Sequence, residues 1–353
     1  MLNETTESLV IVGEVTEAHC KLAEALNRSS LLLSLAVTHM FISACGLVAM
    51  YKYFRTKPIR KAVGLVDTNL KIISVFGFFY YFWGFTTAMC VSLYKICIYV
   101  RHLAPCDYIL SGTVCFVAYS QHNSGCTIAY TSFHIALLLE RLYSTFLDPI
   151  REHPPLFGII VGLIIFVSPQ WLMFFHFYPS YVEKKFIYPR LYCAGVVNNS
   201  TASNASVLRL MITFLIIDFS VTFFDFLLLL YNKHQIAKYY QRISDTYTLT
   251  KSFSLHESRL SIRLIYPFSL TNSLSYCSLC LFFIYFLLQE ASSDPEIDQF
   301  WREAINLLRT VNNFLVFFAL CFVHRQQRTS PSAYIRNENE ADRYFQQFNQ
   351  MIA

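Results

Sequence analysis

The chain has 353 residues, of which 55% are hydrophobic and only 14% charged, against about 25% charged in a typical soluble domain. With a mean hydropathy of +0.40, and with 33 Phe and 23 Tyr, it is too apolar for a water-exposed globule and too rich in aromatic residues for a disordered chain. The composition therefore directs the search to membrane-spanning segments.

Stretches of about 20 mostly apolar residues, the length that an α-helix needs to cross a bilayer, recur along the chain. They lie approximately at 29–51, 66–94, 109–139, 156–178, 208–231, 260–288 and 302–323. Each is far longer than the roughly ten-residue alternating strands of a membrane β-barrel. We therefore expect an all-α fold, a seven-transmembrane helix bundle over residues 29–323, preceded by an N-terminal segment (1–28) and followed by a C-terminal tail (324–353).

The basic residues predict the orientation of this bundle. The segments 52–61, 140–154, 232–263 and 324–353 carry 17 of the 28 Lys and Arg residues. Because loops that are rich in Lys and Arg stay in the cytosol, we expect an extracellular N-terminus and a cytosolic C-terminus.

Glycosylation triplets of the form Asn-x-Ser/Thr support the same orientation. They occur only in the two segments that the charge rule places outside the cell, at Asn3, Asn27, Asn198, Asn199 and Asn204. We expect glycans on this face.

Four of the 11 Cys residues fall outside the expected spans, all on the predicted extracellular and oxidising side: Cys20, Cys97, Cys106 and Cys193. Four cysteines allow three pairings. Cys106 precedes the third span and Cys193 lies between the fourth and fifth, where a bridge ties that loop over the bundle, so we predict Cys106–Cys193, with Cys20–Cys97 left over. No Cys-x-x-Cys pair lies outside the membrane, and we expect no metal site.

Charged residues inside spans are costly and each calls for a partner or a function. Asp67 and Lys71, spaced i and i+4, share one helix face and can neutralise each other. Asp218 lies about 15 Å into the fifth span and Arg309 about 10 Å into the seventh, at a rise of about 1.5 Å per residue. For Asp218, Asp225 and Arg309, a ligand contact and a structural ion pair remain equally open.

Uncharged polar residues and one histidine fall deep in the third, sixth and seventh spans. They are His122, Asn123, Asn272, Tyr276, Asn312 and Asn313. These residues either line a ligand cavity between helices or make ordinary interhelical hydrogen bonds. One turn before Asn272, Pro267 removes a backbone hydrogen bond and predicts a kink that lets the cytosolic half of the sixth span swing.

At the cytosolic end of the third span stands Glu140-Arg141-Leu-Tyr-Ser-Thr. An arginine there can be held by the neighbouring carboxylate in one state and released in another, which gives a two-state element that an outside ligand can bias; a plain interfacial ion pair is the alternative. The stretch resembles the Glu/Asp-Arg-Tyr region of G-protein-coupled receptors, and more closely the Glu-Arg-x-x-Ala-Thr form of nematode serpentine chemoreceptors.

Two further stretches are similar to serpentine receptor class alpha/beta (Srab) and to its sister class alpha (Sra). Pro105-Cys106-Asp107, followed by Ser111 and Cys115-Phe116, resembles their entry to the third span, and Phe253-Ser-Leu-His-Glu257-Ser resembles their Tyr-Gln-x-x-Glu-Asn stretch before a sixth-span proline. With Cys20 the resemblance extends over all seven spans, and Srab is preferred although Ser254 and Ser258 depart from its pattern.

The resemblance implies a chemosensory G-protein-coupled receptor, with Glu140, Arg141 and Pro267 in switching and coupling. We expect it to bind an external small molecule, to signal to a heterotrimeric G protein, and to lie in the plasma membrane of sensory neurons or their cilia; whether it forms a receptor dimer stays open. A seven-span ligand-gated channel or a transporter is the alternative, although no internal repeat is found. We expect no enzymatic activity, no cofactor and no nucleic-acid partner.

Overall fold

The computed structural model describes residues 15–55, 68–101, 103–111, 125–146, 156–182, 201–241, 249–288 and 295–329. Every element within these ranges is a helix, which confirms the predicted all-α fold for this part of the chain. The long helices are α2 (Ser30–Arg55), α4 (Thr68–Val100), α6 (Cys126–Phe146), α7 (Leu156–Val182), α8 (Thr201–Gln241), α9 (Leu249–Leu288) and α10 (Pro295–Thr329).

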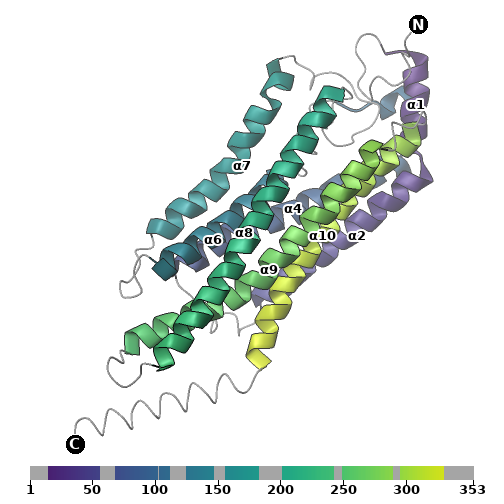
Figure 1. Ribbon diagram of the computed structural model, residues 1–353. Helices are drawn as coiled ribbons and strands as arrows, with labels where there is room; N and C mark the ends of the chain where they lie inside the picture. The colour runs from purple at the N-terminus through teal and green to yellow at the C-terminus, as the bar shows by residue number, and fades with distance from the viewer. Residues whose placement is uncertain are drawn as a thin grey trace, which may run out of the picture.

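The long helices form one elongated bundle (Figure 1). In it α6 contacts α4, α7, α8 and α9, while α2 packs between α4 and α10, and α9 lies between α8 and α10. The short helix α1 (Glu17–Asn27) and the last turns of α10 lie at opposite ends of the bundle. The helix α6 thus contacts four of the six other long helices.

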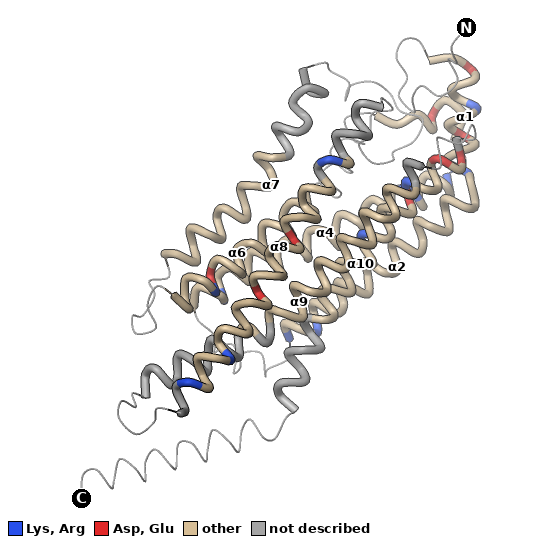
Figure 2. Tube along the Cα trace, viewed as in Figure 1, with Lys and Arg blue, Asp and Glu red and all other residues tan. Residues whose placement is uncertain are grey.

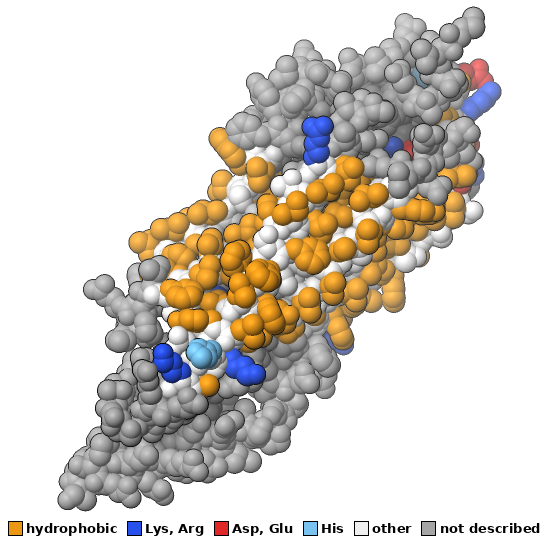
Figure 3. All heavy atoms as spheres, viewed as in Figure 1, with side chains coloured by type: hydrophobic (Ala, Val, Ile, Leu, Met, Phe, Trp, Pro, Cys, Tyr) orange, Lys and Arg blue, Asp and Glu red, His pale blue; other side chains and the backbone are white. Residues whose placement is uncertain are grey.

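The distribution of polarity is the reverse of that in a soluble protein. Large apolar side chains point outward, among them Phe41, which is 66% exposed, whereas His134 and Asp218 are 0% exposed. Apolar side chains cover the middle of the face seen in Figure 3, and Figure 2 shows few charged positions along the middle of the bundle. A helix that is apolar all round fits a lipid environment.

Within the described ranges, four helical stretches are long and apolar enough to cross a membrane. They are Ser30–Arg55, Thr68–Val100, Met211–Lys238 and Ile265–Tyr285. The helices α8 and α9 both continue past their apolar parts, to Gln241 and from Leu249 respectively.

The core of the bundle is aromatic and closely packed. Tyr81 of α4 stacks on Tyr130 of α6 with 4.6 Å between ring centroids. At the other side of α4, Gly158 lets α7 approach so closely that an added Cβ would lie 2.8 Å from the Asn69 Cα. The Gly158 amide donates to Asn69 Oδ1 at 2.9 Å, which fixes this contact.

A disulfide joins Cys20 of α1 to Cys106 of the 3-10 helix η2 (Pro105–Tyr108). The predicted Cys106–Cys193 pairing is therefore wrong, and so is Cys20–Cys97, since Cys97 is a free and exposed thiol. The physical reason is proximity: α1 packs on η2, which brings together two cysteines that are 86 residues apart in the sequence.

The packing of α1 determines the surroundings of one predicted glycosylation site, Asn27. Asn27 is 9% exposed, and its Nδ2 donates to the carbonyl oxygens of Ala23 at 2.9 Å and Tyr108 at 3.4 Å. The Asn27 amide is thus engaged within the protein, and a glycan on it stays a prediction. Asn204 lies in the first turn of α8, and Asn3, Asn198, Asn199 and Cys193 lie outside the described residues.

Candidate functional site

A buried histidine between two carboxylates connects the centre of α6 to α8. His134 Nδ1 lies 2.6 Å from Asp218 Oδ1, and its Nε2 lies 3.7 Å from Asp225 Oδ2. All three side chains are within 2% of full burial. Asp218 and Asp225 are seven residues apart, so two turns of α8 place both carboxylates on one helix face.

The helix α9 completes this group, which we call the His134 cluster: His134, Asp218, Asp225, Ser269 and Asn272. Asn272 Nδ2 donates to Asp218 Oδ1 at 3.0 Å, and the Ser269 hydroxyl donates to Asp225 Oδ2. The spacing of Ser269 and Asn272 by three residues gives them a common face. The cluster therefore holds α6, α8 and α9 together through buried polar contacts.

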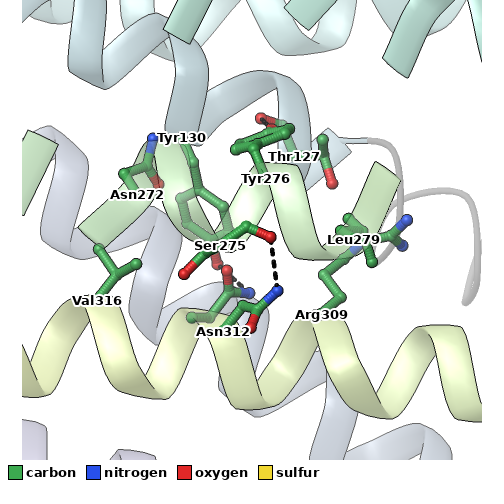
Figure 4. A pocket seen from close by; sticks show the side chains of 10 residues that line it. Thr127, Tyr130, Asn272, Ser275, Tyr276, Leu279, Arg309, Asn312 and Val316 are labelled. Atoms are coloured by element: carbon green, nitrogen blue, oxygen red, sulfur yellow. Dashed lines mark hydrogen bonds between the residues drawn. The ribbon is translucent and has the colours of Figure 1, made fainter. Parts of the chain in front are cut away.

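A second feature, a small cavity between α6, α9 and α10, lies beside the cluster (Figure 4). The centre of a water-sized sphere can occupy a volume of about 20 Å³ in this cavity, so the cavity has room for about one water. The lining residues are Thr127, Tyr130, Asn272, Ser275, Tyr276, Leu279, Arg309, Asn312, Asn313 and Val316. Asn272, Tyr276, Arg309 and Asn312, four of the residues predicted to bind a ligand, are thus brought together here.

The polar groups around the cavity mostly satisfy one another. Tyr276 donates its hydroxyl proton to the Thr127 carbonyl oxygen at 2.8 Å. Asn312 Nδ2 donates to the Ser275 carbonyl oxygen at 2.9 Å, as Figure 4 shows. Asn313 Nδ2 donates to the Tyr130 hydroxyl at 3.3 Å.

Arg309 differs from these groups. Its Nε and Nη1 atoms are buried and find no acceptor among the described residues. In Figure 4 its side chain extends from α10 toward Leu279 of α9. The structural ion pair that the sequence leaves open is not formed between Arg309 and Asp218. Asp218 is engaged by His134 and Asn272 and does not line the cavity.

At the end of α6, Arg141 and Glu140 form a buried pair. Arg141 Nε and Nη2 donate to the two carboxylate oxygens of Glu140, and the side chains are 2% and 1% exposed. The pair is closed in this structure. Pro267 lies inside α9, where its carbonyl oxygen accepts a hydrogen bond from the Thr271 hydroxyl at 2.8 Å.

The sequence analysis missed several buried polar residues. His134 looks isolated in the sequence, and its one signal is its seven-residue spacing from Thr127, with Thr131 between them on the same helix face. Lys95 of α4 forms a salt bridge with Glu303 of α10, and His39 Nε2 lies 2.7 Å from the Thr310 hydroxyl. These contacts connect α2 and α4 to α10.

Other predicted site residues cannot be placed. His122, Asn123 and Asp67 lie outside the described residues. In the described part of the chain, no group of three or more His, Cys, Asp or Glu side chains is arranged to hold a metal ion.

Comparison with known families gives the class of protein. The family model for the serpentine type 7TM GPCR receptor class ab chemoreceptors matches residues 17–353. The chain belongs to this family, Srab. The choice between Srab and Sra is thereby settled, and the receptor is a membrane protein of a chemosensory class rather than of an enzyme class. No curated protein is significantly similar to it.

Proposed function

We propose that this Srab receptor binds a small external molecule within its helix bundle and signals to a heterotrimeric G protein in the cytosol. The observation that carries the proposal is the Glu140–Arg141 pair, buried at the end of α6, in which both carboxylate oxygens of Glu140 accept hydrogen bonds from the Arg141 guanidinium. The carboxylate holds the guanidinium in this state. Loss of these two hydrogen bonds would release Arg141 for other contacts.

The proposed orientation puts residues 1–28 outside the cell and residues 324–353 in the cytosol, with α2, α4, α6, α7, α8, α9 and α10 as the seven spans. Two features support it. Lys52 and Arg55 lie in the last turn of α2, as the positive-inside rule requires of a cytosolic end. The Cys20–Cys106 disulfide lies with α1 at the other end, where the environment is oxidising.

The route from ligand to switch follows shared residues. Asn272 lines the cavity and also donates to Asp218, so it belongs to both the cavity and the His134 cluster. A ligand that forms a hydrogen bond with Asn272 changes the contacts between α9 and α8. Since Pro267 precedes Asn272 by five residues on the cytosolic side and lacks an amide donor, the movement of α9 is concentrated there and widens the space beside Arg141.

The experiment is a ligand screen on cells that express the receptor with a G-protein-dependent reporter. An active compound is expected to produce a response that Arg141→Ala abolishes at equal surface expression. Ser144→Ala, which loses only a hydrogen bond to the Arg141 carbonyl oxygen at 3.2 Å, is the matched control and should respond. A response that survives in Arg141→Ala contradicts the switch assignment.

A second measurement tests the orientation and the place of action. An N-terminal epitope tag should be stained on intact cells, and a C-terminal tag only after permeabilisation. We propose the plasma membrane of sensory neurons or their cilia as the location of the receptor, which the same tags test in the animal. Staining of the C-terminal tag on intact cells contradicts the orientation.

A further inference from the structure

The cavity between α6, α9 and α10 is lined by a cation, Arg309, that has no anionic partner among the described residues. Arg309 presents buried Nε and Nη1 donors with no acceptor among the described residues. The contrast with Lys95 and Arg141 is informative, because each of these lies beside a carboxylate, of Glu303 and Glu140 respectively. An unpaired guanidinium inside a membrane protein is costly, so this position favours an anionic partner from elsewhere.

The neighbouring carboxylate does not meet this need. Asp218 is bonded to His134 at 2.6 Å and to Asn272 at 3.0 Å. The amides of Asn312 and Asn313 and the hydroxyl of Tyr276 donate to protein oxygens. Arg309 is therefore the lining cation whose buried Nε and Nη1 donors have no acceptor among the described residues.

We infer that this cavity takes the carboxylate of a small organic acid, with Arg309 as its counter-ion. The inference rests on the proposed function and adds the chemical class of its ligand. A guanidinium presents paired donors in one plane, which match the two oxygens of a carboxylate. An amine or ammonium ligand is repelled by the same charge.

The walls of the cavity determine the size and shape of the acid. The free space holds about one water, which is less than the three heavy atoms of a carboxylate occupy, so binding of the acid requires the helices to part. Leu279 and Val316 supply apolar surface for a short hydrocarbon or aromatic body. Such a separation displaces α9, the helix whose movement the proposed switch uses.

The test is ligand binding by the purified full-length receptor in lipid nanodiscs, followed as a saturable rise in its thermal midpoint. The probes are acetate, butyrate, hexanoate and benzoate at neutral pH, with the alcohol and the primary amine of each carbon skeleton as matched compounds. At least one carboxylate is expected to raise the midpoint, with its alcohol at least tenfold weaker and its amine inactive. The inference is overturned if no carboxylate acts or if the alcohols act equally.

Variants locate the effect. Arg309→Gln should weaken carboxylate binding at least tenfold, and Arg309→Lys, which keeps the charge without the planar pair of donors, should lie between it and the wild type. Arg209→Gln is the control, since Arg209 is exposed near the start of α8, and it should bind as the wild type does. Unchanged binding in folded Arg309→Gln overturns the inference; if that variant does not fold, the comparison of head groups decides.

The same preparations separate this inference from the proposed function. Receptor-stimulated nucleotide exchange on a G protein is measured without ligand in Glu140→Gln, which does not touch the cavity. Exchange without carboxylate binding leaves the proposed function standing and refutes the acid ligand. Carboxylate binding without exchange in any variant supports the acid site and refutes the proposed function.

Discussion

Removal of the Asp218 carboxylate tests whether the His134 cluster holds α6, α8 and α9 together. In Asp218→Ala, His134 Nδ1 and Asn272 Nδ2 lose acceptors now 2.6 and 3.0 Å away at a site that is 0% exposed. Breaking a buried charged pair costs about 3–5 kcal/mol in soluble proteins, and an interhelical hydrogen bond in a membrane averages about 0.6 kcal/mol. We therefore expect Asp218→Ala to lower the free energy of unfolding by about 2–4 kcal/mol.

The assay is thermal unfolding of the receptor in nanodiscs at one fixed heating rate. Unfolding is monitored through the labelling of cysteine thiols that are buried in the folded receptor. At about 2–4 °C per kcal/mol, Asp218→Ala should lower the midpoint by about 5–15 °C. Asp218→Asn keeps an acceptor oxygen but no charge, and should lose about half as much. Ser220→Ala, on the exposed face of α8 with a bond only to the Ile216 carbonyl oxygen, should stay within about 2 °C. If Asp218→Ala matches this control, the cluster is not a structural joint.

Two further predictions concern other contacts. A peptide map without reductant should contain Cys20 linked to Cys106, and a linked Cys106–Cys97 peptide would contradict the pairing. Reductant should lower the thermal midpoint of the wild type but not of Cys20→Ser, because closing a loop of 86 residues adds at most about 4.5 kcal/mol to the free energy of unfolding. Gly158→Ala should cost about 1–3 kcal/mol through overpacking, because its Cβ would meet α4 backbone at 2.8 Å. The adjacent exposed Ile159→Ala is its control, and equal midpoints for the two would refute the close contact.

The helices could be predicted from the sequence because the bilayer imposes a minimum apolar length. Their ends could not. Hydropathy reports only the lipid-facing part of a helix, whereas α8 continues to Gln241 and α9 begins at Leu249, where backbone hydrogen bonding continues through polar sequence. The region of the cavity was predictable as well, since Asn272, Tyr276, Arg309 and Asn312 stand out as polar residues in apolar spans.

The missing part of the site depends on contacts between distant segments. His134 becomes notable only when α8 places Asp218 and Asp225 on either side of its ring, and no local spacing shows which helix faces α6. The disulfide is similar: four outer cysteines allow three pairings, and the docking of α1 on η2 decides among them. The position of Cys193 in the loop between the fourth and fifth spans was not enough to predict its pairing with Cys106.

The most direct test of the proposed receptor function is nucleotide exchange by a purified heterotrimeric G protein in the presence of the receptor in nanodiscs. Glu140→Gln removes the carboxylate that holds Arg141, and a loss of about 1.4 kcal/mol from the closed state raises the open population about tenfold. The account predicts low exchange for the wild type without ligand, several-fold higher exchange for Glu140→Gln, and a return to the low level in Glu140→Gln/Arg141→Ala. Exchange that stays at the level of empty nanodiscs in Glu140→Gln, with the variant folded and at equal concentration, would contradict it.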